Sequence, residues 1–174
     1  MPNLNFLLLG VFAAIASPFA ALLLSTQGQL GELGRAIGEE SGPLSPALET
    51  GLAIQGRSVY LSLGCVSCHT QQVRPAGQGS DIARGYGQRP SVARDYSLQP
   101  LVLLGERRLG PDLANYGART PRNDLVALLT DPASSGAVWH PAYRFVDSAS
   151  LTALVAYLTT LRQDYASPEA QLKK

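Results

Sequence analysis

The sequence contains very few of the side chains that bind metals or redox cofactors. Its 174 residues include two cysteines, two histidines and one methionine. A disulfide framework for a domain of this size needs more cysteines, spread further apart. Both cysteines and one histidine instead fall within five positions, from Cys65 to His69. This clustering indicates a dedicated site.

An excess of charge of one sign is also lacking. The formal net charge is +1, from 14 basic and 13 acidic residues, which argues against a general nucleic-acid or polyanion binder. Hydrophobic residues make up 45% of the chain, and a chain of this length can bury one ordinary domain and little more. We therefore expect one globular unit with appendages and no nucleic-acid partner.

No charged side chain occurs between Leu4 and Leu24. A helix over this stretch would span roughly 30 Å, the thickness of the hydrocarbon core of a bilayer. The stretch is therefore predicted to be a transmembrane helix, kinked at Ser17-Pro18. The alternative is a cleaved signal peptide with Ala14-Ile15-Ala16 as its cleavage site. That alternative fits less well, because no basic residue precedes the stretch and its length exceeds the usual apolar region.

The five residues Cys65-Val66-Ser67-Cys68-His69 form the sharpest motif in the chain. In haem c, two thiols add to the vinyl groups of the porphyrin, and two intervening residues let both sulfurs reach the ring edge within one helical turn. The histidine that follows then points at the iron. The spacing is typical of haem c attachment. We predict one covalently attached haem, held by Cys65 and Cys68, with His69 as an axial ligand of the iron.

Two other kinds of site use a Cys-X-X-Cys spacing. A structural zinc site needs four ligands, but His140 is the only other histidine and no second cysteine pair is present. A thioredoxin-like dithiol needs an α/β setting with strands around the motif, and the flanking sequence has no strand-like alternation. Haem attachment therefore fits better than either.

The second axial ligand cannot be a methionine from the globular part. Small cytochromes c commonly use methionine, but the only methionine is Met1, before the predicted transmembrane helix. His140 is the remaining strong candidate, so we predict bis-histidine ligation and a lower potential than in methionine-ligated relatives. The alternative is that His140 is a surface or hydrogen-bonded histidine beside Trp139 and Tyr143. The iron would then be five-coordinate or bound by a weaker group.

Helical patterns dominate the rest of the globular part, so the predicted fold class is mainly α. A short helix over 57–63 leads into the cysteines. Another helix is predicted with Thr120 as N-cap and Pro121 at its first position, ending at Asp131-Pro132. Asp147 is a candidate N-cap for a last helix, whose apolar residues follow i, i+3, i+4, i+7 spacing.

These features divide the chain into four predicted parts. We expect a transmembrane anchor at 1–25, a membrane-proximal linker at 26–54, a small cytochrome c-type haem domain at 55–163 and a C-terminal tail at 164–174. Haem c is attached on the outer side of the bacterial cytoplasmic (inner) membrane. The haem domain is therefore predicted to lie on that periplasmic side of a single-pass membrane protein.

Three stretches carry a family resemblance: GRSVYLSLGCVSCHTQQVRP, GYGQRPSVARDYSLQPLVLLGERRLGPDLANYG and HPAY. From about residue 56 to 143 the chain resembles the membrane-anchored mono-haem cytochrome c subunit, or subunit II, of cbb-type (C-family) haem-copper oxidases. The most specific matches are Val73-Arg74-Pro75, Tyr86-Gly87 and Gly110-Pro111-Asp112-Leu113. The family carries Met-Pro-Ala-Tyr or similar where this chain has His140-Pro141-Ala142-Tyr143.

The resemblance implies a non-catalytic electron-transfer subunit without a small-molecule substrate. Such a subunit takes electrons from a cytochrome c donor and passes them to haem b of a polytopic haem-copper catalytic subunit, beside other cytochrome c subunits. It also implies that the carbonyl of Pro111 accepts a hydrogen bond from the non-coordinating nitrogen of His69. Two other functions remain open. They are the mono-haem subunit of a nitric oxide reductase and a free-standing membrane-tethered electron shuttle or haem sensor.

Overall fold

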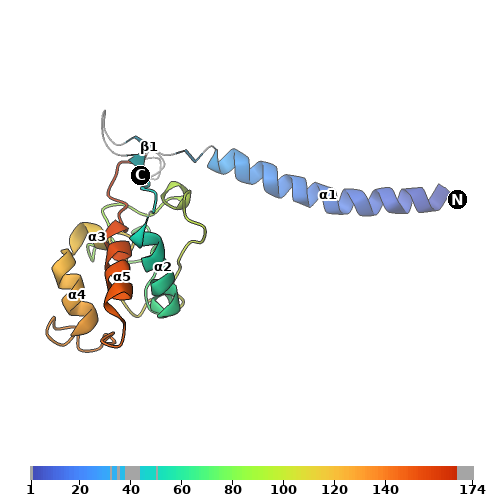
Figure 1. The fold of residues 1–174 in the computed structure, drawn as a ribbon. Coiled ribbons are helices and arrows are strands. Elements are labelled where there is room, and N and C mark those ends of the chain that lie inside the picture. Colours follow the sequence, from blue (N-terminus) through green and yellow to red (C-terminus); the bar gives the residue numbers. More distant parts are fainter. Residues whose placement is uncertain (1, 32, 35, 38–43, 50, 168–174) are drawn as a thin grey trace. The chain divides into compact units, whose positions relative to one another are not determined.

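The computed structural model describes two compact units, Met1–Gly34 and Arg35–Lys174. The residues it describes are 2–31, 33–34, 36–37, 44–49 and 51–167. Figure 1 gives the order of the elements along the chain.

The first unit is one long helix, α1 (Pro2–Leu30), with Pro18 inside it. Residues Asn3–Gln29 are long and apolar enough to cross a membrane, by length and composition. The predicted apolar helix is therefore present, and it continues beyond Leu24. It ends where Gly31 takes a left-handed backbone conformation, with φ of 58°, as glycine commonly does after a helix.

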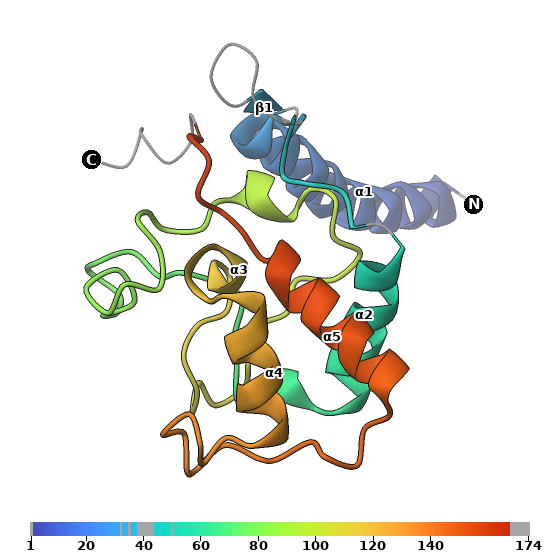
Figure 2. The same cartoon turned by 60° about the vertical axis from the view of Figure 1, so that its left-hand side comes forward.

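The second unit is mainly helical, as predicted. Figures 1 and 2 show its helices joined by long irregular segments. Its elements are β1 (Ala36–Ile37), β2 (Leu44–Ser45), α2 (Leu52–Ser62), the 3-10 turns η2 (Cys65–Ser67) and η3 (Ala93–Tyr96), α3 (Tyr116–Arg119), α4 (Arg122–Thr130) and α5 (Ser148–Thr160). The two short strands pair antiparallel, Ala36 with Ser45 and Ile37 with Leu44.

The helix ends follow from local chemistry. The Asp147 carboxylate accepts hydrogen bonds from the backbone N–H groups of Ala149 and Ser150, so the predicted N-cap of α5 is confirmed. The predicted start of α4 is one residue too early. Pro121 is the N-cap, with an extended ψ of 148°, and Thr120 is instead the C-cap of the preceding helix α3, where its N–H donates to the carbonyl of Tyr116. The predicted end of α4 at Asp131 is confirmed.

Helices α2 and α5 cross in direct contact, which Figure 2 shows from one side. A side chain at Gly56 would overlap the carbonyl oxygen of Ala153, so glycine is what allows this approach. Beside the crossing, the rings of Tyr60 and Tyr157 meet edge to face, with centroids 5.5 Å apart. The core around them consists of Tyr60, Leu103, Leu113, Leu125, Leu129, Leu154, Val155, Tyr157, Leu158 and Leu161.

Candidate functional site

The Cys-X-X-Cys-His motif forms one tight turn directly after α2. Gly64 takes a left-handed conformation, with φ of 72°, and the 3-10 turn η2 begins at Cys65. The N–H groups of Cys68 and His69 both donate to the carbonyl of Cys65, at 3.3 and 3.0 Å. Both cysteines are free thiols and half-buried, and burial raises the pKa of the Cys65 thiol. The turn brings two thiols and one imidazole into a single short segment.

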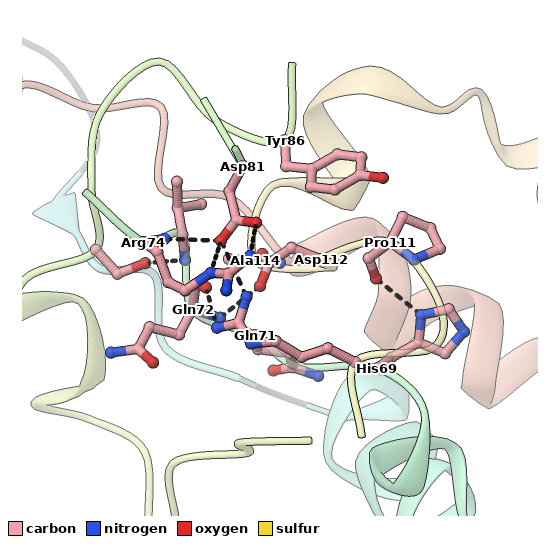
Figure 3. Close-up of polar contacts among 12 residues, drawn as sticks. His69, Gln71, Gln72, Arg74, Asp81, Tyr86, Pro111, Asp112 and Ala114 are labelled. Atoms are coloured by element: carbon pink, nitrogen blue, oxygen red, sulfur yellow. Dashed lines mark hydrogen bonds and ion pairs between the residues drawn. The ribbon is translucent and has the colours of Figure 1, made fainter. Parts of the chain in front are cut away.

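The imidazole of His69 is held by the Gly110-Pro111 loop, as Figure 3 shows. Its Nδ1 lies 2.8 Å from the carbonyl oxygen of Pro111. Only glycine fits beside the ring, because a side chain at Gly110 would overlap Cε1 of His69. Burial lowers the pKa of His69, which favours the neutral imidazole that ligates metals. With Nδ1 hydrogen-bonded, Nε2 is the nitrogen left for a metal.

His140 comes from the loop before α5 and faces His69. The two ring centroids are 6.1 Å apart, with an interplanar angle of 46°. Nδ1 of His140 lies 2.9 Å from the carbonyl oxygen of Pro141. Each histidine therefore binds a proline carbonyl through Nδ1. The loop is fastened to the end of α4, where the N–H of Tyr143 donates to the carbonyl of Leu129 at 2.7 Å.

The spacing of the two rings can be tested against a shared metal ion. An imidazole nitrogen lies about 2 Å from a transition metal that it ligates, so two rings on opposite sides of one metal have centroids roughly 6 Å apart. The observed 6.1 Å fits this spacing. With two free thiols in the same turn as His69, these residues fit a haem.

Figure 3 also shows a polar network to one side of His69 that the sequence did not reveal. The buried carboxylate of Asp81 accepts hydrogen bonds from the backbone N–H, Nε and Nη2 of Arg74. It accepts another from Nη1 of Arg108, whose Nη2 donates to the carbonyl of Gln72 at 3.0 Å. Arg108 itself has a positive φ of 45°. Its two side-chain hydrogen bonds hold the backbone in this conformation, close to the loop that carries Pro111.

The second buried acid of the network is Asp112, next to Pro111. Its carboxylate accepts hydrogen bonds from the N–H groups of Gln72 and Ala114, both at 2.9 Å. Burial raises the pKa of this carboxyl group. The sequence singled out the Gly-Pro-Asp-Leu motif, but it gave no sign of what the carboxylate binds.

A small helical domain with Cys-X-X-Cys-His on one turn and a carbonyl on the histidine is the arrangement typical of cytochromes c. Comparison with protein families finds a match over residues 44–153, more than half of the chain, to cytochrome c oxidase, mono-heme subunit/FixO. The chain belongs to this family. A search of curated proteins finds no match.

The family membership places the chain among haem-binding subunits of electron transport. This chain is a mono-haem cytochrome c oxidase subunit, and it associates with a cytochrome oxidase complex. Together with the long apolar helix α1, the family membership indicates a membrane-anchored protein. The predicted resemblance and the predicted haem cofactor are thus confirmed at the level of the family.

Proposed function

We propose that this chain passes electrons from a cytochrome c donor to haem b of a polytopic haem-copper catalytic subunit. The observation that carries the proposal is the His69 imidazole, held by Pro111 at 2.8 Å beside two free thiols, in a chain of the FixO family. When bound, the haem supplies an iron that alternates between the ferrous and ferric states. Catalysis belongs to the partner subunit.

Cys65 and Cys68 are proposed to attach the haem covalently. Each thiol adds across one vinyl group of the porphyrin, its sulfur forming a bond to one carbon and its hydrogen going to the other. The addition needs no oxidant. Because the two thiols and His69 share one turn, attachment also delivers His69 to the iron.

His69 and His140 are proposed to be the two axial ligands. Their facing rings and their two Nδ1 contacts with proline carbonyls support this assignment, because both arrangements leave Nε2 for the metal. Two imidazoles stabilise the ferric state more than a histidine-methionine pair does. The potential of this subunit should therefore lie below that of methionine-ligated relatives.

The partner is tested by extraction in a mild detergent. We expect the chain to co-purify with a polytopic subunit that contains haem b and copper, and with other cytochrome c subunits. Reduced cytochrome c should then reduce the haem of this chain, and oxygen should reoxidise it. The double substitution Cys65→Ala with Cys68→Ala is the matched control, because the assembled complex would lack this electron carrier. A nitric oxide reductase as partner, or a chain that purifies alone, would refute the oxidase assignment.

We also propose that α1 anchors the chain in the bacterial cytoplasmic membrane, with the haem domain on the periplasmic side. The apolar length of α1 and the outer location of haem c attachment support this orientation. Protease added to spheroplasts should remove the haem domain, and protease added to inverted vesicles should leave it intact. The reverse pattern would exclude this orientation.

A further inference from the structure

The carbonyl that binds His69 belongs to a loop that is hydrogen-bonded to the turn from Cys65 to His69. The N–H of Gly110 donates to the carbonyl of Cys68 at 3.0 Å, and the carbonyl of the next residue, Pro111, lies 2.8 Å from Nδ1 of His69. Beyond Pro111, the loop is held by the Asp112 side chain and by the N–H of Leu113, which donates to the carbonyl of Thr70 at 2.8 Å. The position of the Pro111 carbonyl therefore depends on what holds Asp112.

The side chain of Asp112 ties the loop to the segment that follows His69. It is 2% exposed, and its two oxygens accept from the N–H groups of Gln72 and Ala114 at 2.9 Å each. Both partners are N–H donors, so the residue at position 112 must offer a hydrogen-bond acceptor to each of them. An asparagine amide would turn its NH2 group toward one of these donors.

The backbone of Asp112 is held from the other side by Arg119, at the end of α3. The guanidinium Nη2 of Arg119 donates to the carbonyl oxygen of Asp112. The same guanidinium lies over the rings of Tyr86 and Tyr116, 4.9 and 5.4 Å from their centroids. Two aromatic faces restrict the guanidinium, so it holds the carbonyl from a defined direction.

We propose that Asp112 and Arg119 are positioning residues for His69, and that through Pro111 they set the potential of the bound haem. A well-placed carbonyl strengthens the hydrogen bond from Nδ1–H and makes the imidazole a more basic ligand. A more basic axial ligand favours the ferric state and lowers the potential. The inference rests on the proposed ligation of the haem by His69.

Charge and position have opposite effects at Arg119, which makes the proposal testable. Removing a positive charge near the haem would, by charge alone, favour the ferric state and lower the potential. Removing the hydrogen bond from Arg119 to the carbonyl of Asp112 would weaken the hydrogen bond between His69 and Pro111 and raise the potential. The sign of the change in Arg119→Gln therefore separates the two effects.

The experiment compares haem-loaded, full-length Arg119→Gln and Arg119→Lys with the unaltered chain. Midpoint potentials are measured by optical redox titration, and exchange of the His69 Nδ1–H proton by NMR on chain labelled with nitrogen-15 histidine. We expect a higher potential in both variants, because lysine keeps the charge but not the planar fork. We also expect exchange to be roughly five- to tenfold faster, the change in equilibrium that one ordinary hydrogen bond represents.

Arg122→Gln is the matched control, since it removes the same charge from an exposed position at the start of α4. It should neither raise the potential nor change the exchange rate. A lowered or unchanged potential in Arg119→Gln, or unaltered exchange in both Arg119 variants, would overturn the proposal. Failure of the proposed haem ligation is distinguishable, because the unaltered chain would then lack low-spin haem ligated by His69. Failure of the oxidase assignment alone would show in the partner that co-purifies and would leave these potentials and exchange rates as expected.

Discussion

His69 and His140 face each other with ring centroids 6.1 Å apart, although one follows α2 and the other precedes α5. Each ring directs Nδ1 to a proline carbonyl, His69 to Pro111 and His140 to Pro141. The contact of His140 joins two adjacent residues, whereas the contact of His69 joins residues far apart in the sequence. The pair is thus assembled by two separate loops, and each histidine can be altered independently.

Substitution of His140 tests the proposed axial ligand. In His140→Ala the ferric protein should lose the low-spin EPR spectrum of a bis-imidazole haem, and the ferrous protein should bind CO at the opened position. In His140→Met the potential should rise, since methionine ligation favours the ferrous state relative to imidazole. Val138→Met brings a thioether into the same loop without removing the imidazole, and should change neither property. An unaltered spectrum in His140→Ala would identify another group as the ligand.

Substitution of the cysteines tests covalent attachment. Thioether bonds survive unfolding, so the unaltered chain should retain haem-dependent peroxidase staining in SDS at its own mass, 18.4 kDa. Cys65→Ala combined with Cys68→Ala should abolish the stain. His140→Ala is the control, because it removes a proposed ligand but leaves both thiols in place. Haem that extracts from the unaltered chain into acidic acetone would rule out attachment.

The Asp81 carboxylate should stabilise the domain in a pH-dependent way. The Arg74 side chain, with Arg108, holds the pKa of Asp81 well below its usual range. A carboxyl group with a depressed pKa in the folded state contributes stability above its unfolded pKa of about 3.9, and loses it as the pH falls. In Asp81→Asn the melting temperature at pH 7 should be lower than in the unaltered chain. When the pH is lowered from about 4 to 2, the melting temperature of the variant should fall less steeply than that of the unaltered chain.

The expected loss for Asp81→Asn at pH 7 is on the order of 1–2 kcal/mol. Hydrogen bonds to a charged group contribute about 1.5–3 kcal/mol, and the figure is lower here because both guanidinium groups reach solvent, which screens part of the attraction. The side chains of Arg74 and Arg108 are 35% and 25% exposed. Asp164→Asn is the control, since its ion pair with Arg162 is exposed on both sides. Equal losses of stability in Asp81→Asn and Asp164→Asn would show that the buried network stabilises the domain no more than an exposed ion pair does.

Gly56→Ala should destabilise the haem domain. The new methyl group would overlap the carbonyl of Ala153, so α2 and α5 would have to separate, at a typical overpacking cost of about 1–3 kcal/mol. Gly77→Ala is the control, because nothing lies within 4 Å of the added carbon there. Both are measured by thermal unfolding followed at the haem band. A domain that tolerates Gly56→Ala as well as Gly77→Ala would show that the crossing is not close-packed.

Some of these features could be predicted from the sequence because they depend on neighbouring residues. The turn from Cys65 to His69 needs only five consecutive positions. The cap of α5 at Asp147 and the apolar length of α1 are similarly local. Even here the boundaries moved: α2 begins at Leu52, after Gly51 with its positive φ, well before the predicted residue 57. Helix ends depend on caps and neighbouring turns as well as on periodicity.

Only the tertiary structure decided how the irregular segment between the motif and α3 is held. This segment has no periodic pattern, so its path is set by side chains that meet across long separations. Asp81 meets Arg108, and Arg119 meets the carbonyl of Asp112, through hydrogen bonds that no spacing rule encodes. The sequence by itself determined the groups that can hold a haem. The folded chain decided which residues hold the Pro111 carbonyl in place against His69, because a hydrogen bond between distant residues depends on the whole path of the loop.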